Sequence, residues 1–211
     1  MSHSTTWAGD LTPLNARVID GKEHETFVAS IVVRDGEIAE ISTFIKNATG
    51  EVIDLTGFTI LPGLIDSHVH LQSVPGSKYR NDSIEVIEEL RKHHLKAYVA
   101  SGVTTVLDTA ISASVLRDIQ NHLKRGGTGL RVLALAPVLF SAGGYLDGDL
   151  FKSSSKPATN EADVLDLFEE FKDKPGIVGI KVPLEYGFGP IHSPEMRKTI
   201  ARIAIEKERP L

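Results

Sequence analysis

Residues 59–71 read Thr59-Ile60-Leu61-Pro62-Gly63-Leu64-Ile65-Asp66-Ser67-His68-Val69-His70-Leu71, an apolar run that closes on two histidines. The run predicts a β-strand, on which successive side chains point to opposite faces. His68 and His70 then point the same way, and two neutral imidazoles so placed can hold one metal ion. The same pair is also compatible with two polar residues that meet solvent at the end of a strand.

The segment Leu61-Pro62-Gly63-Leu64-Ile65-Asp66-Ser67-His68-Val69-His70 resembles the metal-binding signature of the amidohydrolase superfamily, which lies at the end of the first barrel strand. The resemblance implies a metal-dependent hydrolase built on a TIM-type barrel. It also implies a small β-sandwich assembled from segments on either side of that barrel.

Composition limits the classes of partner. The chain has 211 residues, of which 41% are hydrophobic and 24% charged, as in an ordinary globular protein. A net charge of -5 gives no basic field, so we expect neither a nucleic-acid nor a membrane partner. The absence of cysteine leaves His, Asp, Glu or a modified Lys to bind a metal. No signal-like segment or long apolar run is evident, so a cytoplasmic location is expected.

The N-terminal part predicts a small all-β unit. Residues 1–13 carry no pattern and are expected to form a loose arm, followed by a β-sandwich segment over residues 14–58. Two β-rich runs, 28–34 and 37–41, are joined by Asp35-Gly36, a dipeptide typical of a type I′ hairpin turn. By the resemblance, this unit is one part of a composite sandwich.

Residues 59–211 alternate between strand and helix patterns. Further strands are predicted at 103–108, 130–139 and 176–182, with helices starting near Ser83, Ser114, Asn160 and Ser193. This order favours parallel βαβ units. A Rossmann-like sheet would give a similar pattern, but no G-x-G-x-x-G opens a helix. A TIM barrel needs eight strands in about 250 residues. The prediction is therefore an α/β fold with about strands 1 to 4 of a partial TIM-type barrel, the N-terminal half.

Lys181 ends the fourth predicted strand, where barrel enzymes present functional groups. In many members of the family that it resembles, a lysine at this position reacts with carbon dioxide to form a carbamate that bridges two divalent ions. A dry pocket would favour the reaction, because burial lowers the pKa of a lysine and leaves the neutral amine. The simpler alternative is a lysine that leaves the sheet for solvent. The resemblance thus gives His68, His70 and Lys181 as metal-binding residues and zinc, as one or two ions, as the expected cofactor.

The remaining histidines and two aspartates are not predicted to bind metal. His93, His94 and His122 are expected on the solvated surface, and His192 in a loop on the side of the active site. Asp66 is expected to orient the histidine turn through hydrogen bonds. Asp108 either supports the metal ligands from behind or is simply a polar strand end. Residues 141–145 would border the site in a barrel.

The function follows from the resemblance alone. Residues 102–106, 131–138 and the Lys181 strand are similar to imidazolonepropionase-like and Xaa-Pro dipeptidase-like members. That branch implies hydrolysis of a C–N bond in a small amide, cyclic amide or dipeptide by a metal-bound hydroxide. The family takes two further histidine ligands and a general-base aspartate from later strands, which have no position here, so the catalytic residue is unknown. The alternative is a catalytically inactive half-barrel that acts as a binding or assembly module. A homo-oligomer, or a separate C-terminal half-barrel, is the expected macromolecular partner.

Overall fold

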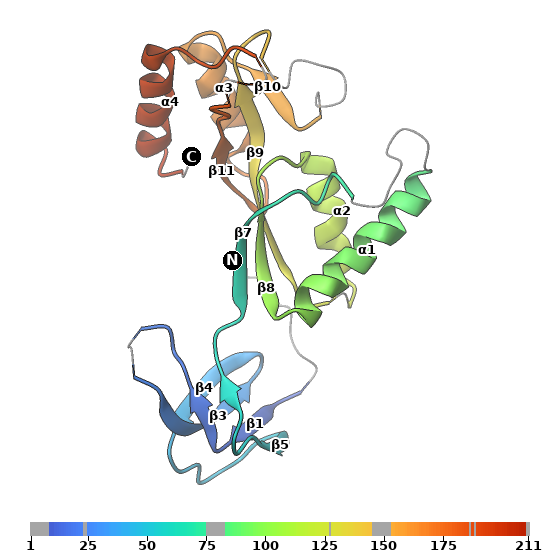
Figure 1. Ribbon diagram of the computed structural model, residues 1–211, viewed down its shortest axis with the longest axis vertical. Coiled ribbons are helices and arrows are strands. Elements are labelled where there is room, and N and C mark those ends of the chain that lie inside the picture. The colour runs from blue at the N-terminus through green and yellow to red at the C-terminus, as the bar shows by residue number, and fades with distance from the viewer. Residues whose placement is uncertain are drawn as a thin grey trace. The chain divides into compact units, whose positions relative to one another are not determined.

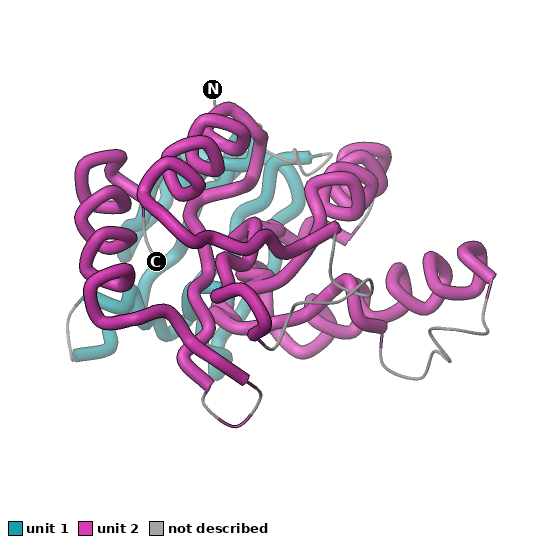
Figure 2. Tube along the Cα trace, turned by 90° about the horizontal axis from the view of Figure 1, so that it is seen from above, with its two compact units in different colours: residues 1–63 teal, residues 64–211 magenta. Residues whose placement is uncertain are grey.

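The chain is divided into two compact units, Met1–Gly63 and Leu64–Leu211, in a computed structural model (Figures 1 and 2). The structure describes residues 9–22, 25–74, 83–126, 128–144, 153–185, 187 and 189–209. No helix among these residues is long and apolar enough to cross a membrane.

The N-terminal unit is a mixed β-sheet centred on β3. Its strands are β1 (Leu11–Leu14), β2 (Ala16–Val18), β3 (Phe27–Arg34), β4 (Glu37–Ser42), β5 (Glu51–Asp54) and β6 (Thr59–Ile60). They pair in the order β5-β1-β3-β2-β6, with β4 on β3. Asp35 and Gly36 both have positive φ, 51° and 77°, as a type I′ turn requires, so the predicted hairpin is confirmed.

Order begins earlier than the predicted arm over residues 1–13 allows. Residues 11–13 belong to β1, which pairs with both β3 and β5. Buried Thr12 explains the difference, because its hydroxyl donates to the Thr49 carbonyl at 2.8 Å and accepts the Thr49 amide at 3.0 Å. A partner this distant in sequence leaves no local pattern. Residues 1–8 lie outside the described residues.

The predicted strand over residues 59–71 is in fact two strands in different units. β6 extends the first sheet by pairing with β2, whereas β7 (Leu64–Val69) begins the second unit. Between them lies Leu61-Pro62-Gly63, which has no strand conformation. Pro62 has no amide hydrogen to give to a ladder, so an apolar run through it cannot remain one paired strand. The division falls at Gly63 rather than at the predicted residue 58.

The C-terminal unit is built on a parallel sheet. β7, β8 (Val103–Asp108), β9 (Arg131–Phe140) and β11 (Ile177–Lys181) are neighbours in chain order. This confirms the α/β class and the four consecutive strands of a TIM-type barrel. A short parallel strand, β10 (Ser155–Pro157), adds to the end of β9, where the sequence predicted a loop.

In the described part of this unit, four helices pack against the sheet in two pairs (Figure 1). They are α1 (Ile84–Ala100), α2 (Ala113–Lys124), α3 (Glu161–Phe171) and α4 (Pro194–Glu206), with Ser83, Ser112, Asn160 and Ser193 as their N-caps. α2 therefore begins one residue before the predicted Ser114. One apolar core joins α1 and α2 to β8 and β9 through Leu95, Val106, Leu116 and Val132. A second core joins α3 and α4 to the ends of β9 and β11.

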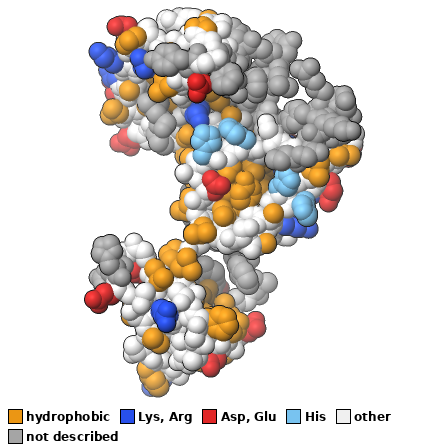
Figure 3. Space-filling view, in the orientation of Figure 1, with side chains coloured by type: hydrophobic (Ala, Val, Ile, Leu, Met, Phe, Trp, Pro, Cys, Tyr) orange, Lys and Arg blue, Asp and Glu red, His pale blue; other side chains and the backbone are white. Residues whose placement is uncertain are grey.

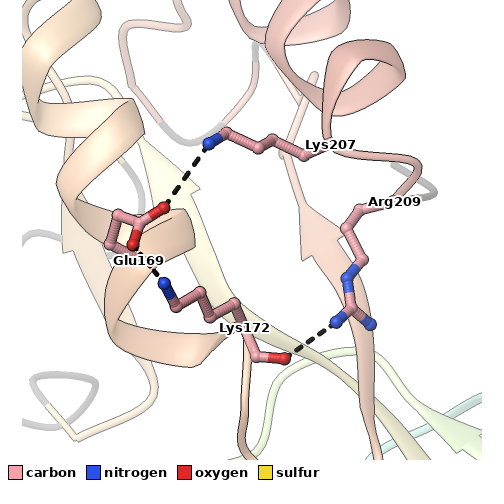
Figure 4. Close-up of polar contacts among 4 residues, drawn as sticks. All are labelled: Glu169, Lys172, Lys207 and Arg209. Atoms are coloured by element: carbon pink, nitrogen blue, oxygen red, sulfur yellow. Dashed lines mark hydrogen bonds and ion pairs between the residues drawn. The ribbon is translucent and has the colours of Figure 1, made fainter.

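The end of α4 is tied to the end of α3 and to the start of β11 (Figure 4). Glu169 pairs with Lys172 at 2.6 Å and with Lys207 at 3.4 Å. Arg209 donates to the carbonyls of Lys172, at 2.8 Å, and Ile177, at 3.3 Å. Exposed ion pairs stabilise little, so the two backbone contacts of Arg209 are the more specific constraint on β11.

Candidate metal centre

The two histidines of the signature lie side by side at the C-terminal end of β7. His68 is within the strand and His70 follows its last residue. Their ring centroids are 5.2 Å apart and the ring planes cross at 81°. Both side chains are exposed, whereas Val69 between them is buried in the helix-covered core. The alternation expected of a strand is thus present at this pair. Figure 3 shows histidine side chains on one face of this unit, beside a hydrophobic area.

Backbone contacts fix the strand end on both sides of His70. The Asp66 carboxylate accepts a hydrogen bond from the amide of His68 at 3.1 Å, in the orienting role expected for Asp66. After the strand, the Leu71 amide donates to Asp108 Oδ2 at 2.5 Å, and Arg91 Nε donates to the Leu71 carbonyl at 2.9 Å. Leu71 is therefore held through both of its backbone polar groups.

Asp108 is the buried anchor of this arrangement. Its side chain is fully buried at the end of β8, and Oδ1 also accepts the Ala110 amide at 2.8 Å. Burial raises the pKa of Asp108, while its backbone hydrogen bonds and the charge of His70 oppose the rise. The sequence left two roles open for Asp108, a support for the metal ligands or a simple polar strand end. These contacts favour the first role, because Asp108 holds the backbone next to His70.

Lys181 lies at the matching end of β11. It is the last residue of that strand and pairs in register with Val138 of β9. Lys181 and His68 line one pocket of about 480 Å³. Partial burial lowers the pKa of Lys181. The pKa of His70 is lowered by partial desolvation of its ring and by the nearby charges of His68 and Lys181, while Asp108 opposes this shift. Lys181 therefore faces a pocket instead of extending freely into solvent.

These residues fit part of a metal site. Two imidazoles supply nitrogen ligands of the kind that zinc prefers, and the lowered pKa of Lys181 favours the neutral amine needed for carbamate formation. Within the described part of the chain, no group of three or more His, Asp or Glu side chains is placed to hold an ion. A complete ligand set would need Lys181 in modified form and further donors.

His93 is exposed and His192 lies in the loop before α4, both as expected, but His94, His122 and His192 have interior contacts that the sequence did not predict. His192 is buried, with Nε2 3.3 Å from the Leu139 carbonyl, so it joins the loop before α4 to β9 and packs in the interior. His122 is half-buried, and its Nε2 has no hydrogen-bond partner among the described residues. His94 was expected at the surface but lines a pocket of about 720 Å³ beside His70.

Sequence reasoning missed several residues that surround the site. Arg91 and Tyr98 of α1 line the larger pocket, and Thr109 and Arg197 line the smaller one. The spacing of Arg91, His94 and Tyr98 on one helical face was a usable signal. The loop at residues 141–144 approaches the segment before α4, since a Cβ on Gly144 would lie 2.8 Å from the Pro190 carbonyl oxygen. Tyr145 of the predicted border lies outside the described residues.

Comparisons with known proteins agree with this architecture. Residues 59–210 match the amidohydrolase family. A dihydroorotase from Streptococcus pneumoniae is 34% identical over 106 residues, which cover 50% of this chain and 23% of the relative. One from Geobacter metallireducens is 37% identical over 91 residues, covering 43% of this chain and 19% of the relative.

Solved structures are similar over nearly the whole chain. An amidohydrolase superposes with a TM-score of 0.72 at 21% identity, and a Xaa-Pro dipeptidase with bound methionine with a TM-score of 0.71 at 21% identity. Each match covers 95% of this chain and 55% of the other. The chain thus spans about half the length of these structures. It belongs to the amidohydrolase family.

The support beneath His70 gives a first prediction. Asp108→Asn should destabilise the C-terminal unit by about 1–3 kcal/mol, because an amide can no longer accept from both the Leu71 and Ala110 amides. Amide hydrogen exchange at Leu71 should accelerate with it. Asp118→Asn, at an exposed position of α2, is the matched control. Unchanged exchange at Leu71 in Asp108→Asn would contradict the supporting role of Asp108.

Proposed function

We propose that this chain carries the first metal-binding elements of an amidohydrolase that hydrolyses a C–N bond in a small amide, cyclic amide or dipeptide. The observation that carries the proposal is the pair of imidazoles 5.2 Å apart at the end of β7, with Lys181 on the pocket shared with His68. Functional groups at the C-terminal ends of parallel strands are typical of barrel enzymes.

In this proposal, His68 and His70 hold one divalent ion, most simply zinc, and carbamylated Lys181 contributes oxygen ligands. A bound ion would polarise the substrate carbonyl and lower the pKa of a water molecule. Asp66, Asp108 and Arg91 keep the two imidazoles in place through the backbone. No catalytic acid or base is assigned within this chain.

The substrate branch remains part of the proposal. Structural similarity to a Xaa-Pro dipeptidase supports the dipeptidase-like branch. Sequence similarity to dihydroorotases supports a second branch, the dihydroorotases, which the sequence motifs did not indicate. Both are compatible with a small amide-type substrate in a pocket of about 480 Å³, within the size range of small-molecule sites.

One observation favours the alternative, a non-catalytic binding or assembly module. The described residues offer two histidines and a lysine, without a third His, Asp or Glu close enough to complete a site. Metal binding therefore decides between the two candidates for the chain as it stands.

Zinc binding should depend on the paired imidazoles. His68→Asn and His70→Asn should each lower zinc affinity roughly tenfold or more, since even residues that only support metal ligands contribute about that much. The measurement is zinc titration by isothermal calorimetry. His93→Asn, an exposed position on α1, should bind zinc like the unaltered chain. Equal affinity in both His68→Asn and His70→Asn would refute the metal site.

Carboxylation of Lys181 gives a separate prediction. Native mass spectrometry in bicarbonate buffer should show an added mass of one carbon dioxide, because the lowered pKa of Lys181 leaves more neutral amine. Lys181→Ala should lose the added mass, and Lys198→Ala, an exposed control on α4, should retain it. An unmodified Lys181 in a chain loaded with zinc would refute the carbamate.

The open sheet edges predict association. Among the described strands, β7 pairs only with β8 and β11 only with β9, and Leu64 and Ile65 on β7 are 52% and 70% exposed. Such an edge favours pairing with a second copy or with a separate half-barrel. Light scattering after size-exclusion chromatography should give at least a dimer mass. Ile65→Lys should reduce association, whereas Ile205→Lys on α4 should not. A monomer at all concentrations would contradict this proposal.

A further inference from the structure

The smaller pocket has an unusual balance of charge. Its lining comes from the C-terminal ends of β7, β8 and β11, from Leu135 in the middle of β9, and from Arg197 and Ile200 of α4. Its polar groups are Ser67, His68, Thr109, Lys181 and Arg197, and its other lining residues are apolar. No acidic side chain lines it, whereas three basic side chains do, those of His68, Lys181 and Arg197. No ion pair joins Lys181 or Arg197 to another residue of the described part of the chain.

Two polar groups of this pocket are buried without a protein partner. Thr109 is only 3% exposed, and its hydroxyl has no hydrogen-bond partner within the described residues. The same holds for Nε of Arg197, which is shielded from solvent on α4. Native proteins leave few buried polar groups unpaired, and those that remain commonly await a ligand, an ion or water.

The position of Thr109 is fixed by the backbone. It follows the anchor Asp108, and its amide donates to the Val69 carbonyl at 3.1 Å, between the two histidines. The backbone of Thr109 therefore keeps a set position relative to the end of β7. Arg197 lies on the first turns of α4, where the Met196 amide donates to Oγ of the N-cap Ser193 at 3.1 Å. Arg197 therefore belongs to an ordered helix, and Thr109 directly follows β8.

We infer that Thr109 and Arg197 form a subsite for the carboxylate of a small substrate, beside His68 and Lys181. A guanidinium presents N–H groups that match the two oxygens of a carboxylate, and a hydroxyl adds a third donor. No Asp or Glu side chain lines the pocket to repel the anion. A carbamate on Lys181 would add a negative charge, which the divalent ion of the proposed function would neutralise. The inference rests on the proposed function. It narrows the substrate class to amides that also carry a carboxylate, such as N-acyl amino acids and dipeptides.

The test compares a carboxylate with its neutral counterpart in the absence of metal. N-acetylglycine and N-acetylglycinamide are titrated into the chelator-treated 211-residue chain, and binding is followed by NMR chemical shifts. N-acetylglycine should bind at least tenfold more tightly than the amide. Arg197→Gln and Thr109→Val should weaken its binding by about tenfold and a few-fold respectively, while Thr109→Ser should retain it. Lys198→Gln, which removes one exposed positive charge from α4, is the control and should bind normally.

The outcomes separate this inference from the metal proposal. Equal binding of the acid and the amide, or unchanged binding by Arg197→Gln in a chain that gives a native NMR spectrum, would overturn the subsite. Loss of carbon dioxide on Lys181 in Arg197→Gln, with N-acetylglycine binding intact, would overturn it too, since Arg197 would then serve the carbamate. Zinc affinity is measured separately and can fail without affecting any of these results.

Discussion

The peptide of Leu71 is the point on which the candidate site depends. Its amide donates to buried Asp108 and its carbonyl accepts from Arg91, so β8 and α1 hold the residue that follows His70. His70, which follows the last residue of β7, would otherwise have the freedom of a loop. Metal-binding side chains need support of this kind, because a small displacement of such a side chain strongly lowers the affinity for the metal. The pairing of β7 with β8, and of β8 with β9, then carries the same constraint across the sheet towards Lys181.

The C-terminal unit was largely predictable from sequence because its elements are local. The capping residues Asn160 and Ser193 and the β-branched run at 103–108 each indicate their element within a few residues. The type I′ turn at Asp35-Gly36 is equally local, since it needs only two residues that tolerate positive φ. The paired placement of His68 and His70 follows from the alternation of a strand, which is also a local rule.

The elements that sequence reasoning missed depend on distant partners. β1 is ordered by the Thr12 contact with Thr49, and β10 exists because the end of β9 extends beyond β8 and offers a free edge. The division at Pro62 and Gly63 was hidden by the continuity of the apolar run. Arg91, Thr109 and Arg197 have no motif of their own. The packing of α1 and α4 brings Arg91 and Arg197 to the two pockets, and Thr109 lines the smaller one because it directly follows β8. The sequence left Asp108 either as a support behind the metal ligands or as a polar strand end, and its contact with Leu71 was needed to favour the first.

The most direct measurement of the central claim is a crystal structure of the chain grown with zinc, with anomalous diffraction recorded at the zinc edge. The account predicts an anomalous peak for a zinc ion that lies about 2.0–2.1 Å from a ring nitrogen of His68 and from a ring nitrogen of His70. Zinc bound elsewhere on the chain while His68 and His70 remain unligated would contradict it.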